Sequence, residues 1–263
     1  MGNKTLFAAL LLLQLGFSDY AQFNLSDKDT VTTNSGLKYI ILEEGDGYNV
    51  EMDKEVAFEW TGYLEDGSSF GTSVNAEPFF FITGKGQVIK GAEEGLALMR
   101  EGDRYLFIMP PELAYGEKGA GDVIPPNSTL IFNYKVLSVT EPKLSIADTM
   151  SAVIKSAGIE ESLRVYRHLK NTAMQKFAFR ESELNRLGYM LMGEGMLDES
   201  VKILSLNVSE YPDSWNVYDS LGEALMNAGE KMESMKMFEK SLELNPDNAS
   251  GRKNLQKLRN SNK

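Results

Sequence analysis

The sequence predicts an α+β domain of short, non-parallel strands, followed by a separate all-α domain of repeated helices. In the first half, residues 55–61 alternate large apolar residues with smaller or polar ones, the pattern of a strand with one buried face. After Pro142 the apolar residues follow helical spacing, and a repeat of 34 residues appears. The chain of 263 residues is long enough for two compact units and their linkers.

Turn signals divide the first half into several strands. Glycine-containing turns are predicted at residues 44–47, 66–69 and 116–121. Further strands are predicted at residues 79–83, 104–109 and 130–139, and a helix at residues 92–100. Short strands with little helix are typical of an α+β domain.

The second half carries a repeat whose members recur in register. Leu187-Gly188 returns 34 residues later as Leu221-Gly222. Three further pairs match at the same spacing: Gly195 with Gly229, Ser200 with Ser234, and Pro212 with Pro246. This pattern resembles the tetratricopeptide repeat (TPR), a unit of two antiparallel helices. The resemblance implies one repeat over residues 181–214 and a second over 215–248. Residues 142–180 are then a helical connector or a degenerate first repeat, and residues 249–263 a capping helix and tail.

The composition argues against several classes of function. A net charge of −11 disfavours nucleic-acid binding, because affinity for the phosphate backbone comes largely from Lys and Arg. Without cysteine the chain can form neither a disulfide nor a thiolate metal site, and its single histidine, His168, offers little to a metal. We therefore expect no nucleic-acid partner, no metal and no cofactor.

The first residues have the pattern of a secretory signal peptide. Lys4 precedes an apolar run over residues 6–15, and small residues follow the run. The run is shorter than the ~20 apolar residues that span a membrane. We expect a cleavable signal peptide over residues 1–21, a linker over 22–33, and a secreted or periplasmic protein. The alternative is a protein anchored in a membrane by an uncleaved signal.

Five short motifs follow one another in the first half. They are Trp60-Thr61-Gly62-Tyr63-Leu64-Glu65-Asp66-Gly67 followed by Phe70, Pro78-Phe79-Phe80-Phe81, Val88-Ile89-Lys90-Gly91, Leu113-Ala114-Tyr115-Gly116, and Ile124-Pro125-Pro126-Asn127. Their order and spacing resemble the FKBP-type peptidyl-prolyl isomerase family. The resemblance implies that residues 34–141 form an FKBP-like domain, in which a curved antiparallel sheet wraps a short helix.

The same resemblance implies a substrate pocket between the sheet and the helix. The backbone N–H of Ile89 and the hydroxyl of Tyr115 would bind substrate carbonyls, and Phe132 would pack against the proline ring. These three are the predicted catalytic residues. The predicted substrate-binding residues are Trp60, Phe70, Phe79, Val88, Ala92 and Val123. Taken singly, each of these residues is equally consistent with ordinary core packing.

Two positions depart from the family's pattern. Gly71 stands where the family usually has an aspartate, and Ala92 where it often has a tryptophan at the pocket floor. Trp60 takes a place usually held by tyrosine, and we expect its larger ring to refill part of the floor. The departures predict reduced isomerase activity and weakened binding of macrolide ligands of the FKBP type.

Two functions are compatible with these features. The first is a prolyl isomerase that acts on proline-containing polypeptides, assists the folding of exported proteins, and recruits clients or a protein partner through the TPR groove. The alternative is a non-catalytic peptide-binding chaperone or scaffold with a degenerate pocket, which Gly71 and Ala92 favour. For the repeat half, a purely structural role is the competing interpretation.

Overall fold

The computed structural model describes residues 29–260. The predicted signal peptide, residues 1–21, and the start of the predicted linker lie outside the described residues. The chain divides into two compact units, Met1–Pro142 and Lys143–Lys263. Each unit has its own hydrophobic core and is described by itself below.

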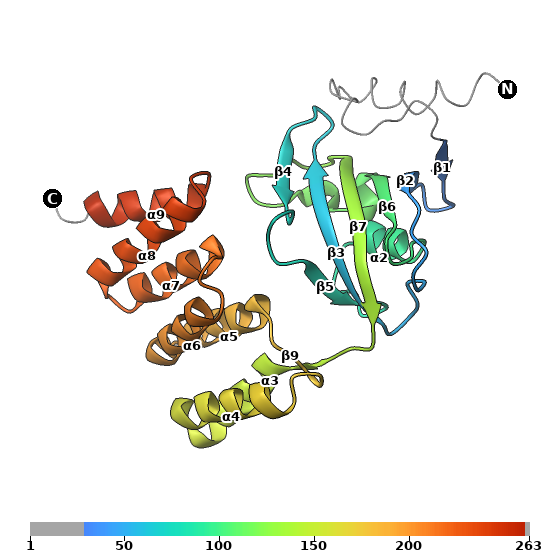
Figure 1. The fold of residues 1–263 in the computed structure, drawn as a ribbon. Helices are drawn as coiled ribbons and strands as arrows, with labels where there is room; N and C mark the ends of the chain where they lie inside the picture. The colour runs from blue at the N-terminus through green and yellow to red at the C-terminus, as the bar shows by residue number, and fades with distance from the viewer. Residues whose placement is uncertain (1–28, 261–263) are drawn as a thin grey trace. The chain divides into compact units, whose positions relative to one another are not determined.

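Within the described part of the first unit, seven strands form one antiparallel sheet (Figure 1). The strands are β1 (Thr30–Thr32), β2 (Lys38–Glu43), β3 (Glu55–Tyr63), β4 (Ser69–Thr72), β5 (Phe79–Ile82), β6 (Arg104–Met109) and β7 (Leu130–Thr140). Their order is β1-β2-β6-β7-β3-β4, and β5 pairs with the other end of β3. The long strands β3 and β7 form the centre of the sheet. The predicted α+β domain with an antiparallel sheet is confirmed.

The helix α2 (Lys90–Leu96) packs against one face of this sheet. Glycines on the buried side of the helix allow a close approach. A Cβ atom added to Gly95 would lie 2.8 Å from Cε1 of Phe107, and one added to Gly91 would lie 2.7 Å from Sδ of Met109. A larger side chain at either position would force the helix or the neighbouring side chain to shift.

The helix differs in extent from the prediction of residues 92–100. It begins two residues earlier and ends at Leu96. The chain turns after Leu96 because the carbonyl of Met99 accepts a hydrogen bond from the N–H of Val50, at 3.0 Å. This pairing between residues distant in the sequence ends the helix, and the apolar spacing of the sequence does not reveal the pairing. Two short 3₁₀ turns, η2 (Pro111–Leu113) and η3 (Gly116–Lys118), follow β6.

The second unit is helical apart from one short parallel pairing, between β8 (Leu144–Ser145) and β9 (Phe177–Ala178). Its helices are α3 (Ile146–Ala157), α4 (Ile159–Thr172), α5 (Glu181–Gly193), α6 (Leu197–Glu210), α7 (Trp215–Asn227), α8 (Lys231–Leu244) and α9 (Ala249–Asn260). Consecutive helices pair as α3/α4, α5/α6 and α7/α8, and α9 packs against α8 (Figure 1). The predicted C-terminal helical region is confirmed. No helix within residues 29–260 is long and apolar enough to cross a membrane.

One buried hydrogen bond recurs in each of the three helix pairs. In each pair a serine hydroxyl on the second helix donates to the backbone carbonyl that lies 12 residues earlier, on the first helix. The three bonds are Ser162 to Met150 at 3.1 Å, Ser200 to Gly188 at 2.8 Å, and Ser234 to Gly222 at 2.7 Å. The pair α3/α4 therefore has the same internal geometry as the two pairs that the sequence repeat identifies.

Gly188 provides a direct test of this close helix pairing. A Cβ atom at Gly188 would lie 2.5 Å from Cγ of Leu204, whereas one at Gly193, on the same helix, would meet nothing within 4 Å. We predict that Gly188→Ala lowers the free energy of unfolding by about 1–3 kcal/mol through overpacking. Gly193→Ala should be neutral, or stabilise the helix by up to about 1 kcal/mol. Urea unfolding of the full chain, followed by helical circular dichroism, measures both. A Gly188→Ala variant as stable as the parent would contradict the packing.

Candidate active site

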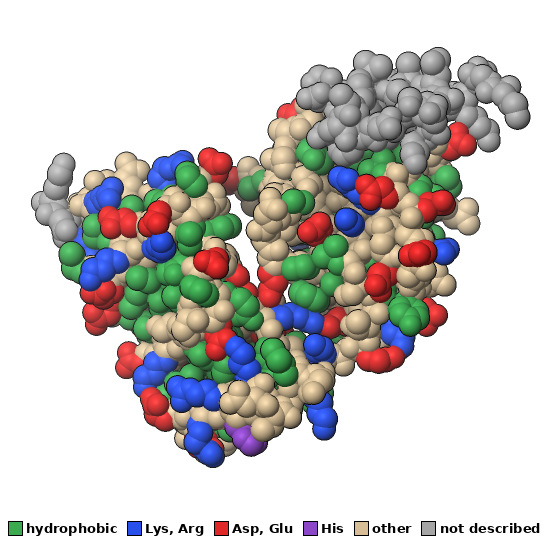
Figure 2. Space-filling model, viewed as in Figure 1, with side chains coloured by type: hydrophobic (Ala, Val, Ile, Leu, Met, Phe, Trp, Pro, Cys, Tyr) green, Lys and Arg blue, Asp and Glu red, His purple; other side chains and the backbone are tan. Residues whose placement is uncertain are grey.

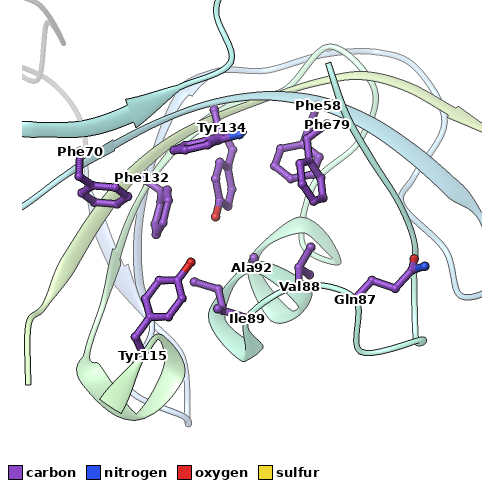
Figure 3. Close-up of a pocket in the computed structure, with 11 residues that line it drawn as sticks. Phe58, Phe70, Phe79, Gln87, Val88, Ile89, Ala92, Tyr115, Phe132 and Tyr134 are labelled. Carbon is purple, nitrogen blue, oxygen red and sulfur yellow. The ribbon is translucent and has the colours of Figure 1, made fainter. Parts of the chain in front are cut away.

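A cavity of about 370 Å³ opens in the first unit between the sheet and the N-terminal end of α2 (Figure 3). Strands β3, β4, β5 and β7 supply one wall, and the other comes from α2, the loop before it and the turn that follows β6. The lining residues are Phe58, Trp60, Phe70, Phe79, Gln87, Val88, Ile89, Ala92, Tyr115, Phe132 and Tyr134. Most of this lining is apolar or aromatic, as is usual for small-molecule and peptide sites.

All but one of the predicted site residues line this cavity. Tyr115, Ile89 and Phe132, the predicted catalytic residues, face it from three separate segments of the chain. Trp60, Phe70, Phe79, Val88 and Ala92 complete the predicted lining. The roles of these residues remain predictions.

Val123 is the exception, because it does not line the cavity and is 55% exposed. Its neighbour Ile124 is turned inward by the pairing of its backbone with Ala120 and joins the core of the domain. The predicted contact of Val123 with substrate stays a prediction.

Phe132 holds the aromatic wall together. Its ring meets Phe70 edge-on at a centroid distance of 5.4 Å, and Trp60 edge-on at 6.0 Å. The ring of Phe70 lies over Gly62, where a Cβ atom would be only 2.3 Å from Cζ of Phe70. Edge-to-face contacts of this kind favour fixed ring positions. The rings of the wall therefore hold one another in place.

Two hydrogen-bond donors at the cavity have no partner within the described residues. Ile89 precedes α2 with an extended backbone, and its carbonyl accepts from the N–H groups of Ala92 and Glu93. Its own N–H donates to no other backbone group within residues 29–260. Tyr115 lies between η2 and η3, is 41% exposed, and directs its hydroxyl into the cavity (Figure 3). Both groups are free to bind the carbonyls of a ligand.

Side-chain bonds to the backbone hold the loop that presents Val88 and Ile89. The side-chain carbonyl of Gln87 accepts from the N–H of Ile82 at 2.6 Å, and the carboxylate of Glu93 accepts from the N–H of Gly84. These bonds join the loop to the end of β5 on one side and to α2 on the other.

The missing aspartate at Gly71 is coupled to the tryptophan at position 60. A Cβ atom on Gly71 would lie 2.8 Å from Cη2 of Trp60, so the indole occupies the space that any side chain at position 71 would need. Gly71 and Trp60 therefore form one change from the family's pattern, in which the apolar surface of the indole replaces a carboxylate.

Sequence reasoning missed three lining residues: Phe58, Gln87 and Tyr134. Strand periodicity could have identified two of them. Phe58 stands two residues before Trp60, and Tyr134 stands two residues after Phe132. Each therefore shares a face of its strand with a predicted pocket residue. Tyr134 is 3% exposed, and burial raises the pKa of its phenol well above the usual value, so it stays protonated at any ordinary pH. Gln87 had no comparable signal.

The described residues hold no group of three His, Asp or Glu side chains arranged to bind a metal ion. His168 lies exposed on α4, in the second unit (Figure 2). The residues that line the cavity offer apolar packing together with a few neutral hydrogen bonds.

The contact between Gly71 and Trp60 generates a test. We predict that Gly71→Asp alone lowers the free energy of unfolding by about 1–3 kcal/mol, because the new side chain collides with the indole. In the Trp60→Tyr background the smaller ring leaves room, and the same change should cost clearly less. Urea unfolding gives the free energy of unfolding of the parent, both single variants and the double variant. These four values form a double-mutant cycle. Equal losses in the two backgrounds would show that the positions are independent.

Comparisons with known proteins agree with this geometry. The family described as FKBP-type peptidyl-prolyl cis-trans isomerase matches residues 47–137. A probable FKBP-type peptidyl-prolyl cis-trans isomerase of Haemophilus influenzae is 47% identical over 113 residues, which are 43% of this chain and 46% of that protein. An FK506-binding protein of Neisseria meningitidis is 44% identical over 101 residues, 38% of this chain and 93% of that protein.

A second Neisseria meningitidis protein, named probable FKBP-type peptidyl-prolyl cis-trans isomerase FkpA, is 43% identical over 118 residues, and the match spans 43% of its length. The chain thus spans about half the length of the larger relatives and nearly all of the small FK506-binding protein. Because the match to that small protein is almost complete, the first unit can be assigned. The chain belongs to the FKBP-type peptidyl-prolyl cis-trans isomerase family.

Proposed function

We propose that the protein catalyses cis-trans isomerisation of X-Pro peptide bonds in polypeptides that enter the cavity of its first unit. The observation that carries this proposal is the aromatic wall around Phe132. It faces two donors that have no partner among the described residues, the N–H of Ile89 and the hydroxyl of Tyr115. Membership of the FKBP-type isomerase family supports it.

The physical basis is the charge distribution of the amide. Rotation about a peptide bond has a barrier of about 18–20 kcal/mol because twisting removes amide resonance. The twisted amide has less charge separation than the planar one, so a dry apolar wall disfavours the planar ground state relative to the transition state. Neither a nucleophile nor a metal takes part. The protein supplies shape, a dry surface and positioning.

The donors hold the peptide while the bond turns. The N–H of Ile89 and the hydroxyl of Tyr115 bind carbonyl oxygens on the two sides of the proline, and Phe132 packs on the proline ring together with Trp60 and Phe70. Fixing the flanking carbonyls means that rotation is confined to the one bond between them.

The isomerase proposal predicts a graded response to two substitutions. The full chain should accelerate the proline-limited refolding of a test protein, a step that takes tens to hundreds of seconds uncatalysed. Phe132→Ala should lower kcat/KM strongly, and Tyr115→Phe by about 1 kcal/mol of transition-state free energy, the net size of one neutral hydrogen bond. Tyr48→Phe is the matched control, because Tyr48 is 77% exposed and lies outside the cavity. A parent protein without activity above background would remove the isomerase proposal.

That negative result would favour the alternative, a peptide-binding chaperone or scaffold. Ala92 and Gly71 are the observations behind it, since they remove a tryptophan and a carboxylate that the family usually has. The two functions separate when a prolyl peptide is titrated into the inactive protein: the alternative requires binding without isomerisation.

We further propose that residues 181–248 are two TPR units that recruit clients or a protein partner, and that α3/α4 is a degenerate first unit. The 34-residue repeat and the recurring serine-to-carbonyl hydrogen bond support this assignment. Hydrophobic side chains gather on the visible face of the second unit (Figure 2). Tyr189 on α5 is 37% exposed.

A photo-crosslinking residue at Tyr189 should capture an unfolded client, whereas one at Met232, 64% exposed on α8, should not. Equal capture at both positions would argue against a binding groove.

Export is the third element of the proposal and rests on the predicted signal peptide. The mature protein should lack 18 to 21 residues at its N-terminus and assist the folding of exported proteins. Mass spectrometry of protein purified from its natural source decides this point. Detection of an intact Lys4 would contradict cleavage.

A further inference from the structure

Tyr134 combines two properties that rarely occur together in one side chain. Its ring is buried in the core of the first unit, packed at a centroid distance of 5.2 Å from both Phe58 and Phe132, and only 3% of the residue is exposed. Its hydroxyl nevertheless points out of this core into the cavity (Figure 3). A phenylalanine would fill the same core space, so packing does not explain the oxygen atom.

The hydroxyl has no partner of its own within residues 29–260. None of the hydrogen bonds of the described residues involves the Tyr134 hydroxyl, and its oxygen faces the cavity rather than the packed core. An empty cavity lets water reach it. When an apolar group displaces that water, the hydroxyl loses its bond and binding is weakened, unless the incoming ligand carries an acceptor.

Two neighbouring residues decide what the hydroxyl can reach. Ala92 has so small a side chain that the space between α2 and the tip of Tyr134 stays open. Tyr115 directs its own hydroxyl into the cavity from the opposite side, so the two phenols point toward one another (Figure 3). Burial, and to a lesser extent the electrostatic effect of Tyr115, raises the pKa of Tyr134 well above its usual value, so the Tyr134 hydroxyl remains a protonated donor.

We propose that Tyr134 is a substrate-binding residue, whose hydroxyl donates a hydrogen bond to a carbonyl oxygen of the bound prolyl peptide, opposite the hydroxyl of Tyr115. This inference rests on the proposed function. The Tyr134 hydroxyl gives the floor of the pocket one polar group, where Ala92 stands in place of a large apolar side chain. A ligand that buries an apolar ring and presents a carbonyl to the floor is preferred over one that presents only hydrocarbon.

The test measures binding of one probe, the N-acetylated and C-amidated tetrapeptide Ala-Leu-Pro-Phe, to the full chain by calorimetry. Tyr134→Phe keeps the ring and its packing, so the domain should fold, and it should raise the dissociation constant about fivefold, as expected for the loss of one neutral hydrogen bond. Tyr105→Phe is the matched control. Tyr105 is a buried phenol on β6, directly opposite Tyr134 in the sheet register, but it does not line the cavity.

A second readout separates a hydrogen bond from a packing effect. In isotope-edited infrared spectra, with each peptide carbonyl labelled in turn, one carbonyl stretch should shift to lower frequency on binding to the parent and shift back in Tyr134→Phe. Unchanged or tighter binding by Tyr134→Phe, with the same spectrum as the parent, would overturn the inference and leave the proposed function standing. A parent protein that binds no prolyl peptide would overturn both.

Discussion

The close approach of α2 to the sheet is the constraint on which the first unit depends. Gly91 and Gly95 allow the helix to approach Met109 and Phe107 closely, and a Cβ atom at either position would force the helix or a neighbouring side chain to shift. This contact fixes the height of the helix N-terminus above the sheet. The segment before it, Val88-Ile89, is thereby held across a narrow gap from Phe132, and that gap is the cavity. The pocket is thus a consequence of how two glycines pack.

The pocket contains two pairs of residues in which a small residue lies next to a large aromatic one. Trp60 and Gly71 form one unit, since the indole lies where a side chain at position 71 would stand. Ala92 and Tyr134 form a second unit, since the small residue on the helix faces a large one on β7. The pocket remains walled by aromatic rings, with a different distribution of polar groups.

Sequence reasoning identified most of this site because its residues sit in motifs with fixed order, and because strand alternation decides which side chains share a face. It failed where a long-range contact decides the local structure. The pairing of Met99 with Val50 ends α2 early, and the bridge between Ala120 and Ile124 turns Val123 outward. Tyr134 was overlooked although its position, two residues after Phe132, places it on the pocket face.

In the helical unit, the structure shows a relation between helix pairs that the sequence does not show. The repeat is visible in the sequence over residues 181–248, and it fades in the first helix pair, where Met150 takes the place of Gly188 and Gly222. The buried serine bond persists in all three pairs, so three-dimensional geometry retains a relation that side-chain identity has lost.

The central claim is that the cavity around Phe132 binds a prolyl peptide and lowers the barrier between its cis and trans forms. Two-dimensional exchange NMR on a short prolyl peptide, in the presence of a small fraction of the full-length protein, measures this most directly, because it reports the cis-trans exchange rate at equilibrium without a coupling protease or a refolding client. The account predicts exchange cross-peaks between the two isomers on a timescale where the free peptide shows none, with broadening of the indole N–H signal of Trp60 as the peptide binds. An exchange rate unchanged by the protein, in the presence of that broadening, would contradict catalysis while leaving a peptide-binding pocket.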